Sequence, residues 1–293
     1  MEDLQNTPHF LWQPASWLHV TGEDTLTFLQ GQFTNDISNL IPKETTYGLW
    51  LTQKGKVLAD SFVLRAGQET FYVGSYACSA ALIRERLEAY IIADEVEIED
   101  VTGEWRGLTL FTEATRNEIA TLLPEVVVFG GRRGDQKHWE VVGLLEAMEK
   151  LVSRVDAEAL LTAEEMELRR IEGGVPAIPQ DVGPNDLPNE GGLDRDAVSY
   201  EKGCYLGQEV MARLRAMGQV RRRLYRVSGE VEAPELPATL FAGERKAGEL
   251  RSTAKTANGF VGLAMITTMH LPEDKKLALE PGAVGMISVS ETV

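Results

Sequence analysis

Short runs of β-branched and aromatic residues, broken by turn-forming residues, mark the first part of the chain. Such runs predict strands, and the turn formers that separate them predict tight reversals. The four predicted strands therefore form an antiparallel meander. They cover residues 16–20, 47–52, 57–65 and 70–74.

Two apolar stripes with helical spacing accompany this meander. The first, formed by Leu26, Leu29, Phe33 and Ile37, follows a Thr-Gly-Glu-Asp sequence that suits a helix start. The second follows Ser75, the expected cap, and comprises Tyr76, Ala80, Ile83, Leu87 and Tyr90. Cys78 lies off the second stripe, and we interpret it as inert packing.

The pattern then changes to alternating strands and helices. Strands are predicted at 96–101, 105–111, 126–129 and 138–142, with a helix at 113–123. Short connections between such elements favour a second, split α+β unit. A further helix is expected over 163–171.

Residues 172–192 predict a long loop, because nine of these 21 residues are Gly or Pro. A loop of that length inside a compact chain is usually functional or disordered. Beyond residue 221 only short β-like runs follow, at 224–227, 259–265 and 284–289. We therefore expect two domains, 1–220 with two intertwined α+β lobes and 221–293 with a β-barrel or sandwich.

Composition narrows the class of protein. The 293 residues are 43% apolar and 25% charged, typical of a globular chain, and they carry a formal net charge of −16. The first residues, Met1 to Gln5, show no basic patch followed by an apolar core, and no apolar run is long enough to span a bilayer. These features predict a cytoplasmic protein without a membrane partner.

Six arginines without an intervening acid stand against this acidic background. Two interpretations stay open: a strand edge whose arginines pair with the surplus acids, or a site for a small anionic ligand. The acidic background argues against duplex nucleic acid as a partner, because duplex binding needs many unopposed basic residues on one face. The arginines are residues 213, 215, 221, 222, 223 and 226.

The densest chemistry lies in Lys202-Gly203-Cys204-Tyr205-Leu206-Gly207-Gln208-Glu209. The glycines free the backbone, and a helix is expected to begin near Gln208. A helix N-terminus and a neighbouring lysine both favour the thiolate, which makes Cys204 a candidate reactive thiol with Lys202 as its activator. The alternative is that Cys204 is a small buried apolar residue in a turn. The two cysteines are too few and too far apart for a disulfide framework or a cysteine zinc site, and no metal site is predicted.

This motif resembles the signature of the YgfZ family, which belongs to the folate-binding superfamily of the glycine-cleavage T protein. Two preceding segments, 168–176 and 187–193, are similar to the same family. The N-terminal segments 20–36 and 55–60 are similar to the start of the superfamily. The resemblance spans about residues 15–227.

The resemblance implies an α+β, three-lobed fold around a central hole, with a small C-terminal β-barrel and tetrahydrofolate, or a one-carbon derivative, as cofactor. Glu190 occupies the place of a T-protein acid that reads the pterin edge, which suits a carboxylate that accepts two parallel N–H bonds. The arginine patch would receive the folate glutamate tail. The residues expected to contact the cofactor are Glu190, Asp181, Tyr205, Gln208, Glu209, Arg213 and Arg223.

Asp60 falls at the position of an acid that the T protein uses near the reactive end of folate. An Asp on a strand between Leu58 and Phe62 would be partly desolvated, which raises its pKa. Asp181 replaces another acid of the T protein and is one methylene shorter. This departure from the T-protein pattern at Asp181 counts against faithful aminomethyl transfer.

Two functions follow from the resemblance. The favoured one is a folate-binding accessory protein for assembly or repair of iron-sulfur clusters, which supports cluster-dependent enzymes including those that thiolate tRNA. Its partners would be client or assembly proteins, and Cys204 its working thiol. The alternative is a folate-dependent one-carbon transferase with Asp60 as catalytic acid.

Overall fold

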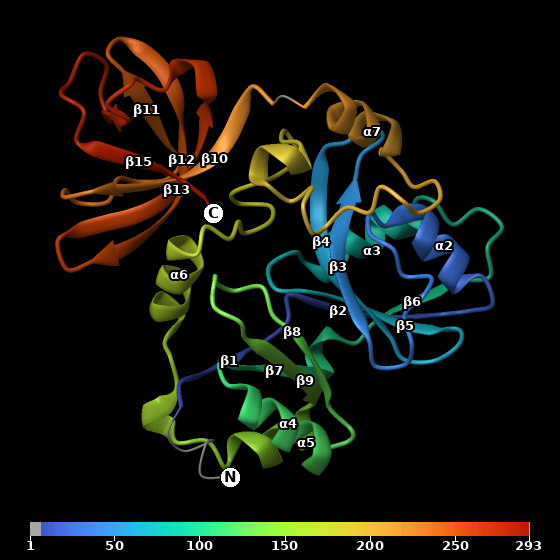
Figure 1. Cartoon of the computed structure of the whole chain (residues 1–293). Coiled ribbons are helices and arrows are strands. Elements are labelled where there is room, and N and C mark those ends of the chain that lie inside the picture. The colour runs from blue at the N-terminus through green and yellow to red at the C-terminus, as the bar shows by residue number, and fades with distance from the viewer. Residues whose placement is uncertain (1–6, 219, 293) are drawn as a thin grey trace.

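The computed structural model describes residues 7–218 and 220–292. Met1 to Gln5, on which the expected absence of a leader depends, lie outside the described residues. The described chain forms three lobes (Figure 1), each with its own sheet. This confirms the predicted α+β class and the three-lobed architecture.

The first lobe contains the predicted meander as an antiparallel sheet in the order β3-β4-β5-β2-β6. Its helices are α2 (Thr25–Gln32) and α3 (Ala80–Glu88). Leu18, Leu49, Trp50 and Val63 from the sheet are completely buried, and they form the core with residues of both helices. The strands are β2 (Ser16–Thr21), β3 (Thr45–Leu51), β4 (Val57–Arg65), β5 (Thr70–Ser75) and β6 (Glu97–Asp100).

The second lobe has a four-stranded sheet in the order β1-β7-β9-β8. Helices α4 (Glu113–Leu122) and α5 (Leu145–Val152) accompany it. The aromatic residues Trp12, Trp17, Phe62 and Phe129 form a separate cluster drawn from both lobes. The strands are β1 (His9–Trp12), β7 (Trp105–Leu110), β8 (Val127–Gly130) and β9 (Trp139–Leu144).

The third lobe is a nearly closed six-stranded barrel in the order β11-β12-β13-β10-β15-β14. A single bridge between Phe241 and Ala278 links β11 to β14 across the seam. The strands are β10 (Arg222–Gly229), β11 (Ala238–Ala242), β12 (Arg245–Thr256), β13 (Gly259–Thr267), β14 (Lys276–Leu277) and β15 (Ile287–Glu291).

The segments between the lobes carry the motifs. Helix α6 (Ala163–Glu172) lies between the second lobe and the barrel, and helix α7 (Gln208–Met217) lies over the first lobe (Figure 1). A capping box of Thr162 and Glu165 starts α6. The short helices η1, η2, η3 and η4 cover Thr102–Glu104, Ala157–Ala159, Pro188–Gly191 and Thr268–His270.

Three local predictions were wrong. Helix α2 ends at Gln32, so Ile37 contributes to the core from beyond the helix. Helix α3 is capped by Ser79, whose side chain accepts from Leu82 N, whereas Ser75 ends β5. The long strand β12 was missed because its buried positions hold mainly small or polar residues such as Ala247, Gly248 and Ser252.

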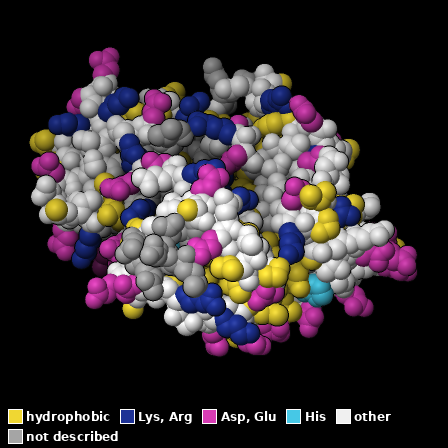
Figure 2. Space-filling model, turned by 60° about the horizontal axis from the view of Figure 1, so that its bottom comes forward, with side chains coloured by type: hydrophobic (Ala, Val, Ile, Leu, Met, Phe, Trp, Pro, Cys, Tyr) yellow, Lys and Arg dark blue, Asp and Glu magenta, His cyan; other side chains and the backbone are white. Residues whose placement is uncertain are grey.

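The net negative charge is not segregated on the face seen in Figure 2, where acidic and basic side chains are interspersed. Among residues 7–218 and 220–292, no helix is long and apolar enough to cross a membrane.

Candidate functional site

The Lys-Gly-Cys motif forms a turn that leads directly into α7, as the sequence predicted. Gly207 has φ +87°, and a Cβ at this position would lie 2.9 Å from the Thr52 carbonyl oxygen. Only glycine combines this backbone conformation with so close an approach. Helix α7 begins at Gln208, and the Cys204 side chain in the preceding turn is exposed.

Lys202 is buried beneath this turn, and its ammonium donates to three main-chain oxygens. The acceptors are the carbonyls of Gln30 at 2.7 Å, Phe33 at 2.6 Å and Asn35 at 2.9 Å. Burial lowers the pKa of Lys202 to about 8, while Asp36 opposes that shift. Because an ammonium has three N–H donors and each has a main-chain acceptor here, none is left to hydrogen-bond the Cys204 thiolate.

The other motif residues have different surroundings. Tyr205 is buried, its ring lies 5.4 Å from the Lys202 ammonium, and burial strongly raises its pKa. Gln208 is half-buried at the start of α7, while Glu209 and Arg213 are exposed. Cys204 is thus exposed, which excludes the alternative of a small buried residue in a turn, while the contacts of its neighbours were not predicted.

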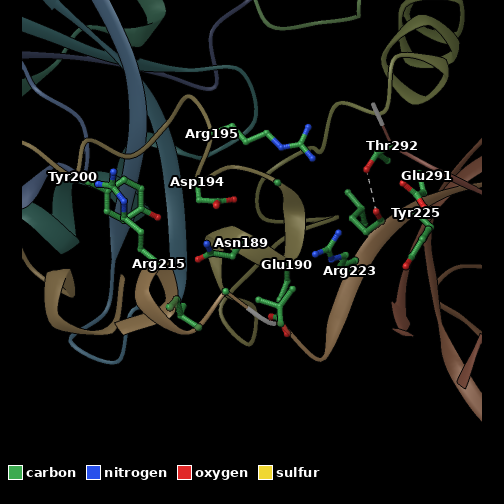
Figure 3. Close-up of a pocket in the computed structure, with 15 residues that line it drawn as sticks. Asn189, Glu190, Asp194, Arg195, Tyr200, Arg215, Arg223, Tyr225, Glu291 and Thr292 are labelled. Atoms are coloured by element: carbon green, nitrogen blue, oxygen red, sulfur yellow. Dashed lines mark hydrogen bonds between the residues drawn. The ribbon is translucent and has the colours of Figure 1, made fainter. Parts of the chain in front are cut away.

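A cavity of about 430 Å³ lies between η3, the end of α7 and the barrel strand β10 (Figure 3). Asn189 and Arg195 lie on its loop side and Arg223 on its barrel side. Of the predicted cofactor contacts, only Glu190 and Arg223 line this cavity. Its further polar lining residues are Asp194, Tyr200, Arg215, Tyr225, Glu291 and Thr292.

Glu190 is held by an arginine of the predicted patch. Arg222 donates from Nε to Glu190 Oε1 at 3.0 Å and from Nη2 to Oε2 at 2.9 Å, and Leu187 N also donates to Oε2. This bidentate pair takes part of the acceptor capacity that an aminopyrimidine edge would use. For Arg222 the acid-pairing interpretation of the patch holds, and the pterin contact of Glu190 stays a prediction.

Asp181 is part of the framework. Its side chain is fully buried and accepts from Arg170 Nη1 at 2.7 Å, Ala177 N at 2.8 Å and Ser252 Oγ at 2.7 Å. The residue ties α6, the Gly- and Pro-rich loop and β12 together. The predicted cofactor contact of Asp181 is therefore replaced by a structural role.

Asp60 lies apart from the cavity, on β4, and is 7% exposed. Burial raises the pKa of its carboxyl, and hydrogen bonds from Ser75 and Tyr47 oppose this shift. Tyr47 donates to Oδ2 at 2.9 Å, Ser75 donates to Oδ1 at 2.8 Å, and the Cys78 sulfur lies 3.3 Å from Oδ1. The predicted desolvation is thus present, and Cys78 contacts this acid rather than only filling space.

Folate would fit the cavity in part. A volume of this size suits a small-molecule ligand. Arg223 is exposed in the lining and could pair with a carboxylate, and Asn189 is a further polar residue of the lining. On the pterin side, Glu190 shares its acceptor capacity with Arg222. Asn189 was not among the predicted contacts, although its position beside Glu190 in the matching segment was a usable signal.

The described residues contain no group of three or more His, Cys, Asp or Glu side chains that could hold a metal ion.

The fold has clear counterparts among known proteins. The family model described as the GCVT N-terminal domain matches residues 14–126. The aminomethyltransferase T of the glycine cleavage system from Bartonella henselae superposes with a TM-score of 0.78 at 17% identity, covering 98% of this chain and 86% of that one. The chain therefore has the fold of the glycine-cleavage T protein.

Two curated relatives are similar in sequence to most of this chain. The chain is 25% identical to the tRNA-modifying protein YgfZ of Edwardsiella ictaluri, over 98% of this chain and 92% of the relative. It is 27% identical to the iron-sulfur cluster assembly factor IBA57 homolog of Neurospora crassa, over 75% of this chain and 54% of that protein. These matches confirm the predicted resemblance to the YgfZ family.

Proposed function

We propose that this protein supports the assembly or repair of iron-sulfur clusters in cluster-dependent enzymes, including those that thiolate tRNA, and that Cys204 is its working thiol. The observation that carries the proposal is the exposed Cys204 on an anchored turn at the start of α7. A thiol that must react with a partner has to be accessible, and Cys78 is not, being 1% exposed. The names of the two relatives agree with this role.

The partners that we propose are client or assembly proteins, because a thiol on an exposed turn is accessible to another protein. Folate is the proposed small-molecule ligand, and the cavity beside Arg223 is its proposed site. In that arrangement Arg223 pairs with the glutamate tail.

The test of the thiol is complementation. In a deletion strain, Cys204→Ala should fail to restore cluster-enzyme activity, because alanine has no nucleophilic or metal-binding sulfur. Cys78→Ala is the matched control and should restore the activity, provided that immunoblots show equal protein levels. Full activity with Cys204→Ala would remove the thiol from the function.

The alternative, a one-carbon transferase, is favoured by the desolvated Asp60. Asp60→Asn in the same assay separates the two functions. Loss of activity in Asp60→Asn with a silent Cys204→Ala would support the transferase, and the reverse result would support the assembly factor.

Folate binding has its own test. Calorimetric affinity for tetrahydrofolate should rise with the number of glutamates in the tail, and Arg223→Ala should flatten that rise. Since exposed ion pairs contribute up to about 1 kcal/mol, the loss should reach about fivefold. Arg221→Ala is the control, because Arg221 is exposed on the same segment but does not line the cavity. Affinity that ignores both tail length and Arg223 would contradict this site.

A further inference from the structure

The oxygens that surround the Lys202 ammonium all come from the end of one helix and the residues after it. Helix α2 ends at Gln32 and has no basic residue in its last turn. The carbonyl of Gln30 lacks its usual helical partner, because Thr34 N donates to Leu49 O instead. Lys202 lies 172 residues further along the chain and supplies the cation that the negative end of this helix favours.

The loop that carries Lys202 is attached to the same segment on both sides. Before the lysine, Ser199 N donates to Thr34 O at 3.0 Å. After it, Leu206 N donates to Gly31 O at 3.2 Å. Gly203 and Cys204, which lie between these attachments, are exposed. The end of α2 is therefore the platform on which the cysteine turn is mounted.

We propose that Lys202 is a positioning residue, which fixes the Cys204 turn through the carbonyls of Gln30, Phe33 and Asn35 and does not act on the thiol as an acid, base or counter-charge. The side chain is 8% exposed, and its three donors are used by these oxygens. A lysine that activated a thiolate through a hydrogen bond would keep a donor for the sulfur, and whether its charge acts through space is measured by the pH profile of Cys204 alkylation. That this positioning matters for activity rests on the proposed function of Cys204. The anchoring of the turn by Lys202 does not depend on that function.

Hydrogen exchange measured by mass spectrometry tests the anchoring. In Lys202→Met, amides of residues 199–206 should exchange at least about tenfold faster, because hydrogen bonds from a charged group are lost. The amides of the barrel should be unchanged, which distinguishes positioning from general destabilisation. Lys54→Met, at an exposed lysine in the β3–β4 turn, is the control and should leave exchange at 199–206 unaltered. Unchanged exchange in Lys202→Met would overturn the proposal.

The pH profile of Cys204 alkylation tests the second part. In Lys202→Gln, which keeps an N–H donor but carries no charge, the midpoint of the profile should stay within about half a pH unit of the wild-type value. A rise of about one unit or more would show that the ammonium stabilises the thiolate, and would overturn the proposal. If Lys202→Met does not fold, Lys202→Gln replaces it in the exchange experiment. Because glutamine keeps N–H donors but no charge, the amides of residues 199–206 should then exchange faster than in the wild type, but by less than after loss of all donors.

Both measurements are independent of cluster chemistry. If Cys204→Ala proves silent in cells while exchange and alkylation behave as expected, the proposed function fails and the positioning role stands. If Cys204→Ala is inactive but Lys202→Met leaves exchange unchanged, the positioning role fails and the proposed function stands.

Discussion

Asp181→Ala is expected to lower the free energy of unfolding by about 3 kcal/mol, because it removes the fully buried one of the two carboxylates that pair with the Arg170 guanidinium. The Asp181 side chain is fully buried, and the Arg170 side chain that pairs with it is only 11% exposed. The substitution also leaves Ala177 N and Ser252 Oγ without their acceptor. Urea unfolding followed by circular dichroism measures the effect.

Glu167→Ala is the matched control, since Glu167 pairs with the same arginine but is 38% exposed. Exposed pairs contribute at most about 1 kcal/mol, so this variant should be nearly as stable as the wild type. An equal loss in both variants would show that Arg170 rather than Asp181 dominates. A change in folate affinity with unaltered stability would return Asp181 to the ligand contacts that the sequence predicted.

Gly207→Ala is expected to cost about 1–3 kcal/mol, because alanine is strained at the positive φ of this position. The added Cβ would also lie 2.9 Å from the Thr52 carbonyl oxygen, so the hairpin turn beneath α7 would have to shift. Since Gly207 follows the cysteine turn, alkylation of Cys204 should change as well. Thermal and urea unfolding, together with the alkylation rate, measure both consequences.

Gly203→Ala provides the comparison within the same motif. A Cβ at Gly203 would have no atom within 4 Å, and its φ lies outside the positive region. This substitution should therefore change stability by less than about 0.5 kcal/mol. Equal costs at the two glycines would mean that the turn owes its shape to something other than the conformation of Gly207.

The sequence predicted those features that depend on neighbouring residues. The strand pattern gave β2 and β4 nearly to the residue, and the glycines of the motif placed the start of α7 at Gln208. Local signals are enough for such elements, because a strand or a helix start is determined within a few positions.

The contacts of the candidate site could not be predicted in this way. Lys202 reaches oxygens 172 residues away, and Glu190 pairs with Arg222, 32 residues away. Main-chain carbonyls carry no side-chain signal in the sequence, and six clustered arginines give no indication of which acid each one meets. The family resemblance supplied roles for Glu190 and Asp181, but the local ion pairs gave both residues different surroundings.

The barrel contributes both arginines that neutralise Asp186 in the Gly- and Pro-rich loop. Arg222 on β10 donates to Asp186 Oδ1 at 3.0 Å, and Arg251 on β12 donates to Oδ2 at 2.5 Å. The Asp186 side chain is only 3% exposed, so loss of either arginine would leave a buried carboxylate with one counter-ion fewer. Folding of the loop and docking of the barrel are therefore cooperative. The domain boundary near residue 220 divides the sequence, but the ion pairs of Asp186 connect the residues before it to the barrel after it, so the two parts should unfold together.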